Sequence, residues 1–290
     1  MTDRLRPLWN FGDLDGTEER LRGQLASEAS DEGRAEVLAE LARVEGLRGN
    51  FEAGERLVEQ AELLAGDSEV ARARIAIERG RLRRSGGDPE AALPHFESAF
   101  EIASGAEHWF IAADAAHMAA LASPGRDGFV DWTQRGIDLA EEHEGAAYWA
   151  GPLLNNLGWE HYDAGDFEQA LDAFERALRA RERDPGNPGA IEIARYAVGK
   201  ALRALGRSDE AIPLLEQAVS WAAGQDAPDG WFHEELAEEY AAVGRADEAR
   251  EQAALAIPLL EEADPSFASD AERSARLRAL AGEAGEQPGA

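Results

Sequence analysis

The chain has 290 residues, no cysteine and a formal net charge of −29 at pH 7. The lack of cysteine excludes disulfides and thiolate metal sites, and the excess of acidic residues argues against nucleic acid and anionic membranes as partners. No stretch approaches the roughly 18 consecutive apolar residues of a membrane span, and residues 1–16 have no apolar run, so we expect a cytoplasmic protein without a signal peptide.

Residues 1–30 are predicted to form an N-terminal cap. Thr17–Glu28 has the pattern of a short helix, and Trp9 and Phe11 are available to cover the apolar face of the element that follows. A cap of this kind is expected in a repeat array, because a terminal unit has a neighbour on one side only.

A recurring turn organises the chain from residue 31 onward. Its anchor residues are spaced by 38, 37, 41, 41 and 38 positions, at Gly49, Gly87, Pro124, Gly165, Gly206 and Gly244. Helical stripes of apolar residues precede and follow each anchor. Ala, Leu, Glu and Arg dominate, whereas Val, Ile and Thr are sparse, so the composition favours helices over strands. The pattern predicts an all-α fold of about six helical hairpins.

The clearest hairpin lies between Leu157 and Leu178. Leu157 and Gly158 belong to its first helix, Gly165-Asp166-Phe167 to its turn, and Ala170, Phe174 and Ala177 to its second helix. Gly165 is placed to take a left-handed conformation after the first helix, and Gly158 is small where two helices would cross closely. This unit resembles the tetratricopeptide repeat, and its long period is similar to that of kinesin-light-chain-type arrays. The resemblance implies a right-handed α-solenoid.

The resemblance covers about residues 31–262. We expect repeats at about 31–66, 67–105, 106–144, 147–184, 187–224 and 228–262, followed by a C-terminal capping helix and tail at 263–290. The chain departs from the family pattern in lacking the early Trp and in displacing the closing Pro. His117 also stands where a small residue belongs, so the third repeat is expected to be the irregular one.

No residue pattern predicts chemistry. His233-Glu234-Glu235 resembles the start of a helical zinc-protease motif, but Ala237 stands where the second His would be needed. The six His residues show no ligand spacing, and no Gly-rich segment lies between a strand and a helix. We therefore predict a protein that is not an enzyme, with no cofactor and no metal.

The resemblance implies that the first helix of each pair lines the concave face and that partners bind there. Basic and aromatic residues gather at these positions in a chain that is otherwise acidic. The predicted binding set is Arg81, Arg84, Met118, Asn155, Trp159, Tyr162, Tyr196, Lys200, Arg203 and Trp231. Arginine and aromatic side chains are the usual anchors of protein recognition. The alternative is that these side chains only pack between repeats.

The resulting hypothesis is a scaffold that binds an extended protein or peptide, acidic or of mixed charge, along the concave groove. Two other functions remain open: a ligand-sensing regulatory protein and a self-associating array. The oligomeric state is not predicted by the sequence.

Overall fold

Helices make up 81% of the computed structural model, which describes residues 3–184 and 186–283, and none of these residues forms a strand. The predicted all-α fold is confirmed. The chain divides into two compact units, Met1–Asn156 and Leu157–Ala290, which we call unit 1 and unit 2. The boundary falls within helix α8 (Ala150–Asp163).

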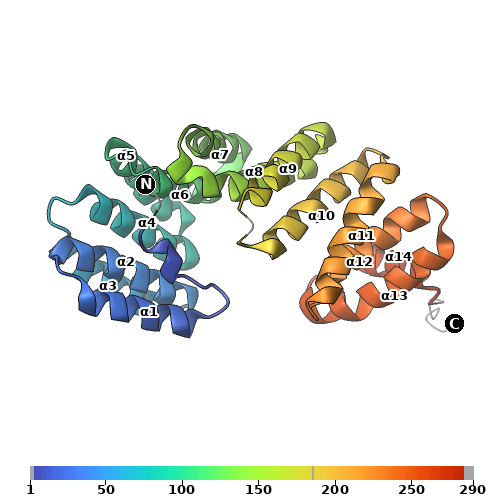
Figure 1. The fold of residues 1–290 in the computed structure, drawn as a ribbon, viewed down its shortest axis with the longest axis horizontal. Coiled ribbons are helices and arrows are strands. Elements are labelled where there is room, and N and C mark those ends of the chain that lie inside the picture. The colour runs from blue at the N-terminus through green and yellow to red at the C-terminus, as the bar shows by residue number, and fades with distance from the viewer. Residues whose placement is uncertain (1–2, 185, 284–290) are drawn as a thin grey trace. The chain divides into compact units, whose positions relative to one another are not determined.

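Unit 1 is built from helices that pack in sequence order (Figure 1). A 3-10 turn, η1 (Arg6–Leu8), precedes α1 (Leu14–Ser27), which is the leading helix expected at Thr17–Glu28. Three hairpins follow, which are α2 (Asp31–Leu47) with α3 (Phe51–Ala65), α4 (Glu69–Ser85) with α5 (Pro89–Gly105), and α6 (Trp109–Ala122) with α7 (Gly125–Glu142). A second 3-10 segment, η2 (Glu144–Trp149), then leads to α8.

Unit 2 is also built from helical pairs and begins with the later part of α8. Its remaining helices are α9 (Phe167–Glu182), α10 (Pro188–Ala204), α11 (Ser208–Gly224), α12 (Gly230–Ala242), α13 (Ala246–Ala263) and α14 (Ala271–Ala281). The first helices of successive pairs contact one another, as α10 contacts α12 and α12 contacts α14. These first helices therefore form one layer, and the second helices of the pairs lie outside it.

Side-chain caps define where many of these helices begin. Ser30, Ser68, Asp88 and Asn187 each accept a hydrogen bond from a backbone amide in the first turn of the helix that follows. Such a cap satisfies an amide that has no partner within the helix. The cores between the helices are small and alanine-rich, with buried rings such as Phe96 and Phe174 filling the spaces that alanine leaves.

The third pair differs from the others in its turn and in the segment that follows it. Its left-handed turn residue is Gly125 (φ +74°), one position after Pro124. The His117 ring lies 5.4 Å from the ring of Trp149 in η2, a segment that the other pairs lack. Burial lowers the pKa of His117 to about 4, so this histidine is neutral near pH 7.

Gly165 and Gly206 both have positive φ, +81° and +70°, as the sequence predicted. Replacing Gly165 by valine should lower the free energy of unfolding by about 1 kcal/mol or more, because a β-branched residue resists this conformation. A Cβ at Gly165 would meet no other atom within 4 Å, so the cost is one of backbone conformation alone. Gly165→Asn should cost less, because asparagine tolerates the left-handed region. Urea unfolding in which Gly165→Val matches the parent would contradict this turn assignment.

Candidate functional site

Side chains from the first-helix layer of unit 2 line a cleft of ≈ 430 Å³. The cleft receives residues from α8, α10, α12 and α14. Its lining consists of aromatic rings and of charged side chains of both signs, and comprises Trp159, Tyr196, Lys200, Arg203, Trp231, Glu234, Glu235, Glu238, Arg273 and Arg276.

The aromatic rings of the cleft are held in place by the packing behind them. The ring of Trp159 meets Phe174 edge-on at a centroid distance of 5.0 Å and lies 6.4 Å from the ring of Tyr196. Tyr196 in turn lies 5.4 Å from Phe232, which is buried. Burial raises the pKa of Tyr196 to about 12, so its hydroxyl stays protonated. Rings fixed in this way offer apolar area at a low entropic cost to a ligand.

Glu235 organises the charged side of the cleft. Its side chain is 2% exposed and accepts hydrogen bonds from Lys200, at 2.7 Å, and from Arg203. Burial alone would raise the pKa of Glu235, but the two neighbouring cations outweigh burial and lower it. Burial likewise opposes the charge of Lys200, but Glu235 raises the pKa of that lysine above its ordinary value. All three groups are therefore charged near neutral pH.

Helix α14 supplies the other two cations. Arg273 donates to Glu234 and, at 2.7 Å, to Asp264, while Arg276 donates to Glu238. Four cations thus face three carboxylates around the cleft. Arg276 is 49% exposed, and Arg203 uses only its Nε for Glu235. Within the residues that the structure describes, the terminal nitrogens of Arg203 have no hydrogen-bond partner, so they are available to a ligand.

The structure brings five of the ten predicted residues together in this cleft: Trp159, Tyr196, Lys200, Arg203 and Trp231. Tyr162 stands beside it, with its ring 5.6 Å from that of Trp159. The other four belong to unit 1. There, Arg81 pairs with Glu78 and Asp114, Arg84 donates to the Leu121 carbonyl, Asn155 is partly buried in α8, and Met118 is buried against Phe96.

The sequence interpretation missed Arg273 and Arg276, because α14 was assigned only a capping role. Gly282 follows Gly244 by 38 residues, which is a spacing already present among the anchors, and it has a φ of +80°. This glycine is the signal that would have placed α14 in the first-helix layer and its arginines beside α12. The acidic partners Glu234, Glu235 and Glu238 also stand in a run that the sequence alone does not assign to pairs.

Hairpins stacked in sequence, with a cleft on their first helices, define a helical-repeat protein. Two family models described as tetratricopeptide repeat match the chain, one over residues 155–230 and the other over residues 230–254. Residues 155–254 of the chain thus match tetratricopeptide repeats, in agreement with the resemblance seen in the sequence. Among curated proteins, none matches its sequence.

Solved structures share the fold at low sequence identity. A signal transduction ATPase with numerous domains that has a tetratricopeptide repeat sensor, from Pyrococcus horikoshii, is 16% identical with a TM-score of 0.69; the match covers 87% of this chain but only 40% of that protein. A Rap protein complexed with competence and sporulation factor is 16% identical, with a TM-score of 0.57, over 92% of this chain and 76% of that one. The quorum sensor NprR from B. thuringiensis is 12% identical, with a TM-score of 0.55, over 96% and 85%.

Two features are absent from the described residues. No helix among them is both long enough and apolar enough to cross a bilayer. No three His, Asp or Glu side chains in the described part of the chain come together as metal ligands would.

Proposed function

We propose that the chain is a non-catalytic scaffold that binds a protein or peptide, and that the unit 2 cleft receives it. The observation that carries the proposal is the cleft itself, where the fixed rings of Trp159 and Tyr196 lie beside Arg203 and Arg276. Each of these guanidinium groups uses only its Nε for a carboxylate. Aromatic and Arg side chains are the residues on which protein recognition most often depends. The chain is similar in fold to a Rap protein in complex with competence and sporulation factor and to a quorum sensor, which supports a ligand-binding role.

The pKa shifts in the cleft favour binding over catalysis. A general acid or base works best when its pKa lies near the operating pH. Here the pKa of Glu235 is lowered, that of Lys200 is raised, and that of Tyr196 is about 12, so each group is moved away from neutrality. Such groups keep one charge state, which suits a fixed recognition surface.

The charge balance favours a ligand of mixed charge over a purely acidic one. Carboxylates from α12 already accompany Lys200, Arg273 and Arg276. A ligand carboxylate would find donors at the terminal nitrogens of Arg203 and Arg276, while a ligand cation could approach Glu238. An apolar or aromatic ligand side chain would pack against Trp159 and Trp231.

A selection from random 12-residue displayed peptides tests the proposal. We expect enriched peptides to bind the parent chain and to bind the double variant Arg203→Met with Arg276→Met at least about tenfold more weakly, as measured by fluorescence anisotropy. In this variant Glu235 keeps Lys200 as its partner, so the helices should stay intact.

The matched control is Arg176→Met with Arg179→Met on α9, which makes the same change of charge outside the first-helix layer. It should alter the affinity of these peptides by less than about twofold. Peptides that bind both double variants equally would place the binding surface elsewhere, and a selection that enriches nothing would argue against peptide binding as the function.

A further inference from the structure

The first helices α2, α4 and α6 of unit 1 form a face that we call its inner face. This face is not open, because the chain's own residues 3–11 lie on it. We call these residues the leading segment. In unit 2, the first-helix positions Tyr196 and Lys200 line a cleft of ≈ 430 Å³. The positions of α4 that correspond to them in the repeat are Ile77 and Arg81, and the equivalent space beside Ile77 amounts to ≈ 20 Å³. Such a volume holds about one water molecule, so the leading segment fills this face.

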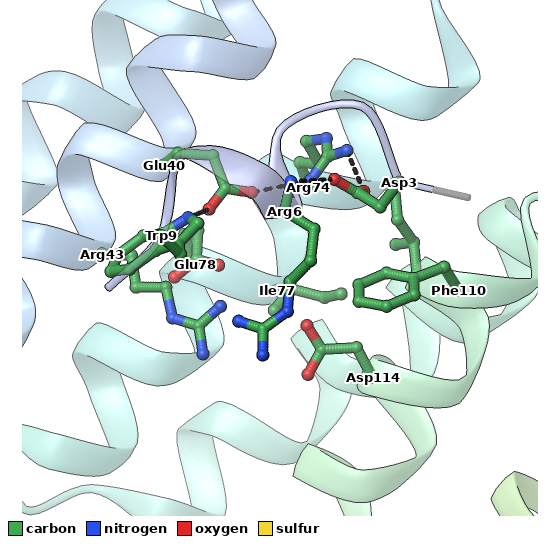
Figure 2. A pocket seen from close by; sticks show the side chains of 11 residues that line it. Asp3, Arg6, Trp9, Glu40, Arg43, Arg74, Ile77, Glu78, Phe110 and Asp114 are labelled. Atoms are coloured by element: carbon green, nitrogen blue, oxygen red, sulfur yellow. Dashed lines mark hydrogen bonds and ion pairs between the residues drawn. The ribbon is translucent and has the colours of Figure 1, made fainter. Parts of the chain in front are cut away.

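The leading segment is held by polar and aromatic side chains and by Leu5, which is buried in the apolar core of unit 1. The side chain of Asp3 is 2% exposed and pairs with Arg74, which also pairs with Glu36 at 3.0 Å and with Glu40 at 2.6 Å. Trp9 donates from its indole nitrogen to Glu40 at 2.7 Å. Figure 2 shows these contacts as a continuous chain of interactions from Trp9 through Glu40 and Arg74 to Asp3.

Arg6 and Arg43 make cation–aromatic contacts with the rings around the leading segment. Arg6 donates to the Tyr148 hydroxyl at 2.8 Å, and its guanidinium lies 4.6 Å from the centre of that ring. Arg43 on α2 lies 4.9 Å from the centre of the Trp9 ring, which is stacked on Phe11. Each is a favourable contact of about 0.5–1 kcal/mol where water has access.

These contacts resemble those of a bound peptide more than those of a core element. The backbone of the segment forms only one 3-10 turn, η1, and the amides of Leu5 and Arg6 bond to the Asp3 carboxylate rather than to a neighbouring helix. Only Leu5 is a fully buried apolar side chain in this segment. Asp3, Arg6 and Trp9 recur every third residue and contact the inner face, while Arg4 between them pairs with Glu28 and Glu36.

We propose that the inner face of unit 1 is a second peptide-binding site, occupied in this structure by the leading segment. The ligand class follows from the occupant: a peptide in which a carboxylate, a guanidinium and an indole are spaced as in Asp3, Arg6 and Trp9. The site is separate from the unit 2 cleft, and a partner with this pattern takes the place of the leading segment.

Binding in trans tests this site in the full chain. Asp3→Ala, Arg4→Ala, Arg6→Ala and Trp9→Ala together remove the charged and indole anchors of the leading segment, while Arg74 keeps Glu36 and Glu40 as partners. A fluorescent peptide with the sequence of residues 3–12 should bind this released chain at least about tenfold more tightly than it binds the parent, whose own segment competes. Adding Arg203→Met and Arg276→Met should leave this binding unchanged, because the unit 2 cleft takes no part in it.

A peptide with alanine in place of Asp3 and Trp9 should bind the released chain at least about tenfold more weakly. The proposal is overturned if the released chain binds neither peptide, if it binds both alike, or if it loses cooperative unfolding, because the segment would then be part of the core. Hydrogen exchange in the parent gives an independent measure. The amides of Leu5 and Arg6 should exchange at least about 100-fold faster than those in the middle of α4, and equal protection would also overturn the proposal.

Discussion

Replacing Arg74 by methionine should lower the free energy of unfolding by about 3–5 kcal/mol, which is typical of removing one partner from a buried ion cluster. Arg74 is buried and pairs with Asp3, Glu36 and Glu40. Burial alone would lower its pKa, but the surrounding carboxylates outweigh burial and raise it. Without the guanidinium, three carboxylates would share a site from which water is largely excluded. Urea unfolding followed by circular dichroism measures the loss.

Arg72→Met is the matched control for this substitution. Arg72 is exposed on the same helix, so the same change should alter the stability by no more than about 0.5 kcal/mol. Arg74→Lys should lose part of the stability, because the single ammonium group of lysine cannot replace a planar guanidinium whose nitrogens reach three carboxylates. Equal stabilities of Arg74→Met and Arg72→Met would mean that the carboxylates reach solvent without rearrangement.

The substitution Gly158→Ala should destabilise the chain by about 1–3 kcal/mol through overpacking. A Cβ at Gly158 would lie 2.4 Å from two ring atoms of Phe174, which is fully buried and cannot swing into solvent. Trp159 packs on the same ring, so a shift of Phe174 would also disturb the cleft. Thermal and urea unfolding should both show the loss.

The substitution Gly23→Ala should instead raise the free energy of unfolding. Gly23 is an exposed helical residue, and a Cβ there would meet nothing within 4 Å. Alanine favours the helix by about 0.5–1 kcal/mol over glycine, so this variant should be more stable than the parent. If both alanine variants gained stability, the close helix crossing at Gly158 would be ruled out.

The fold was largely predictable because its determinants are local and recur along the chain. Gly165 and Gly206 mark turns that need a left-handed residue, and small residues such as Gly80 and Gly158 face the buried rings Phe96 and Phe174. The shift of the third turn to Gly125 could not be predicted, because Pro124 and Gly125 both signal a turn and only packing selects between them.

The cleft was only half predictable. The repeat spacing placed Trp159, Tyr196 and Lys200 on one layer, since helical positions fix which side chains share a face. It could not assign their ionic partners, because the chain is so rich in acidic residues that many pairings are possible. Met118 satisfied the same positional rule, but its side chain is buried in a cluster with Phe96 and does not line a cleft.

The leading segment was the least predictable part. Trp9 and Phe11 were expected to cover the first hairpin, but Asp3 and Arg6 lie outside any helical periodicity, so their contacts with Arg74 and Tyr148 had no signal in the sequence. Contacts between residues so far apart in the chain depend on tertiary structure, which a local pattern does not contain.

Lys200 is the only lysine in the chain, and it lies in the unit 2 cleft. Every enzyme or reagent that acylates lysine side chains therefore has a single target in this sequence. Acylation would remove the positive charge, leave Glu235 with Arg203 alone and place an amide beside Tyr162 and Tyr196. Such a modification would alter the cleft without touching the rest of the molecule, and an occupant of the cleft would shield the amine. The chemical reactivity of one nitrogen atom thus reports whether the cleft is empty or filled.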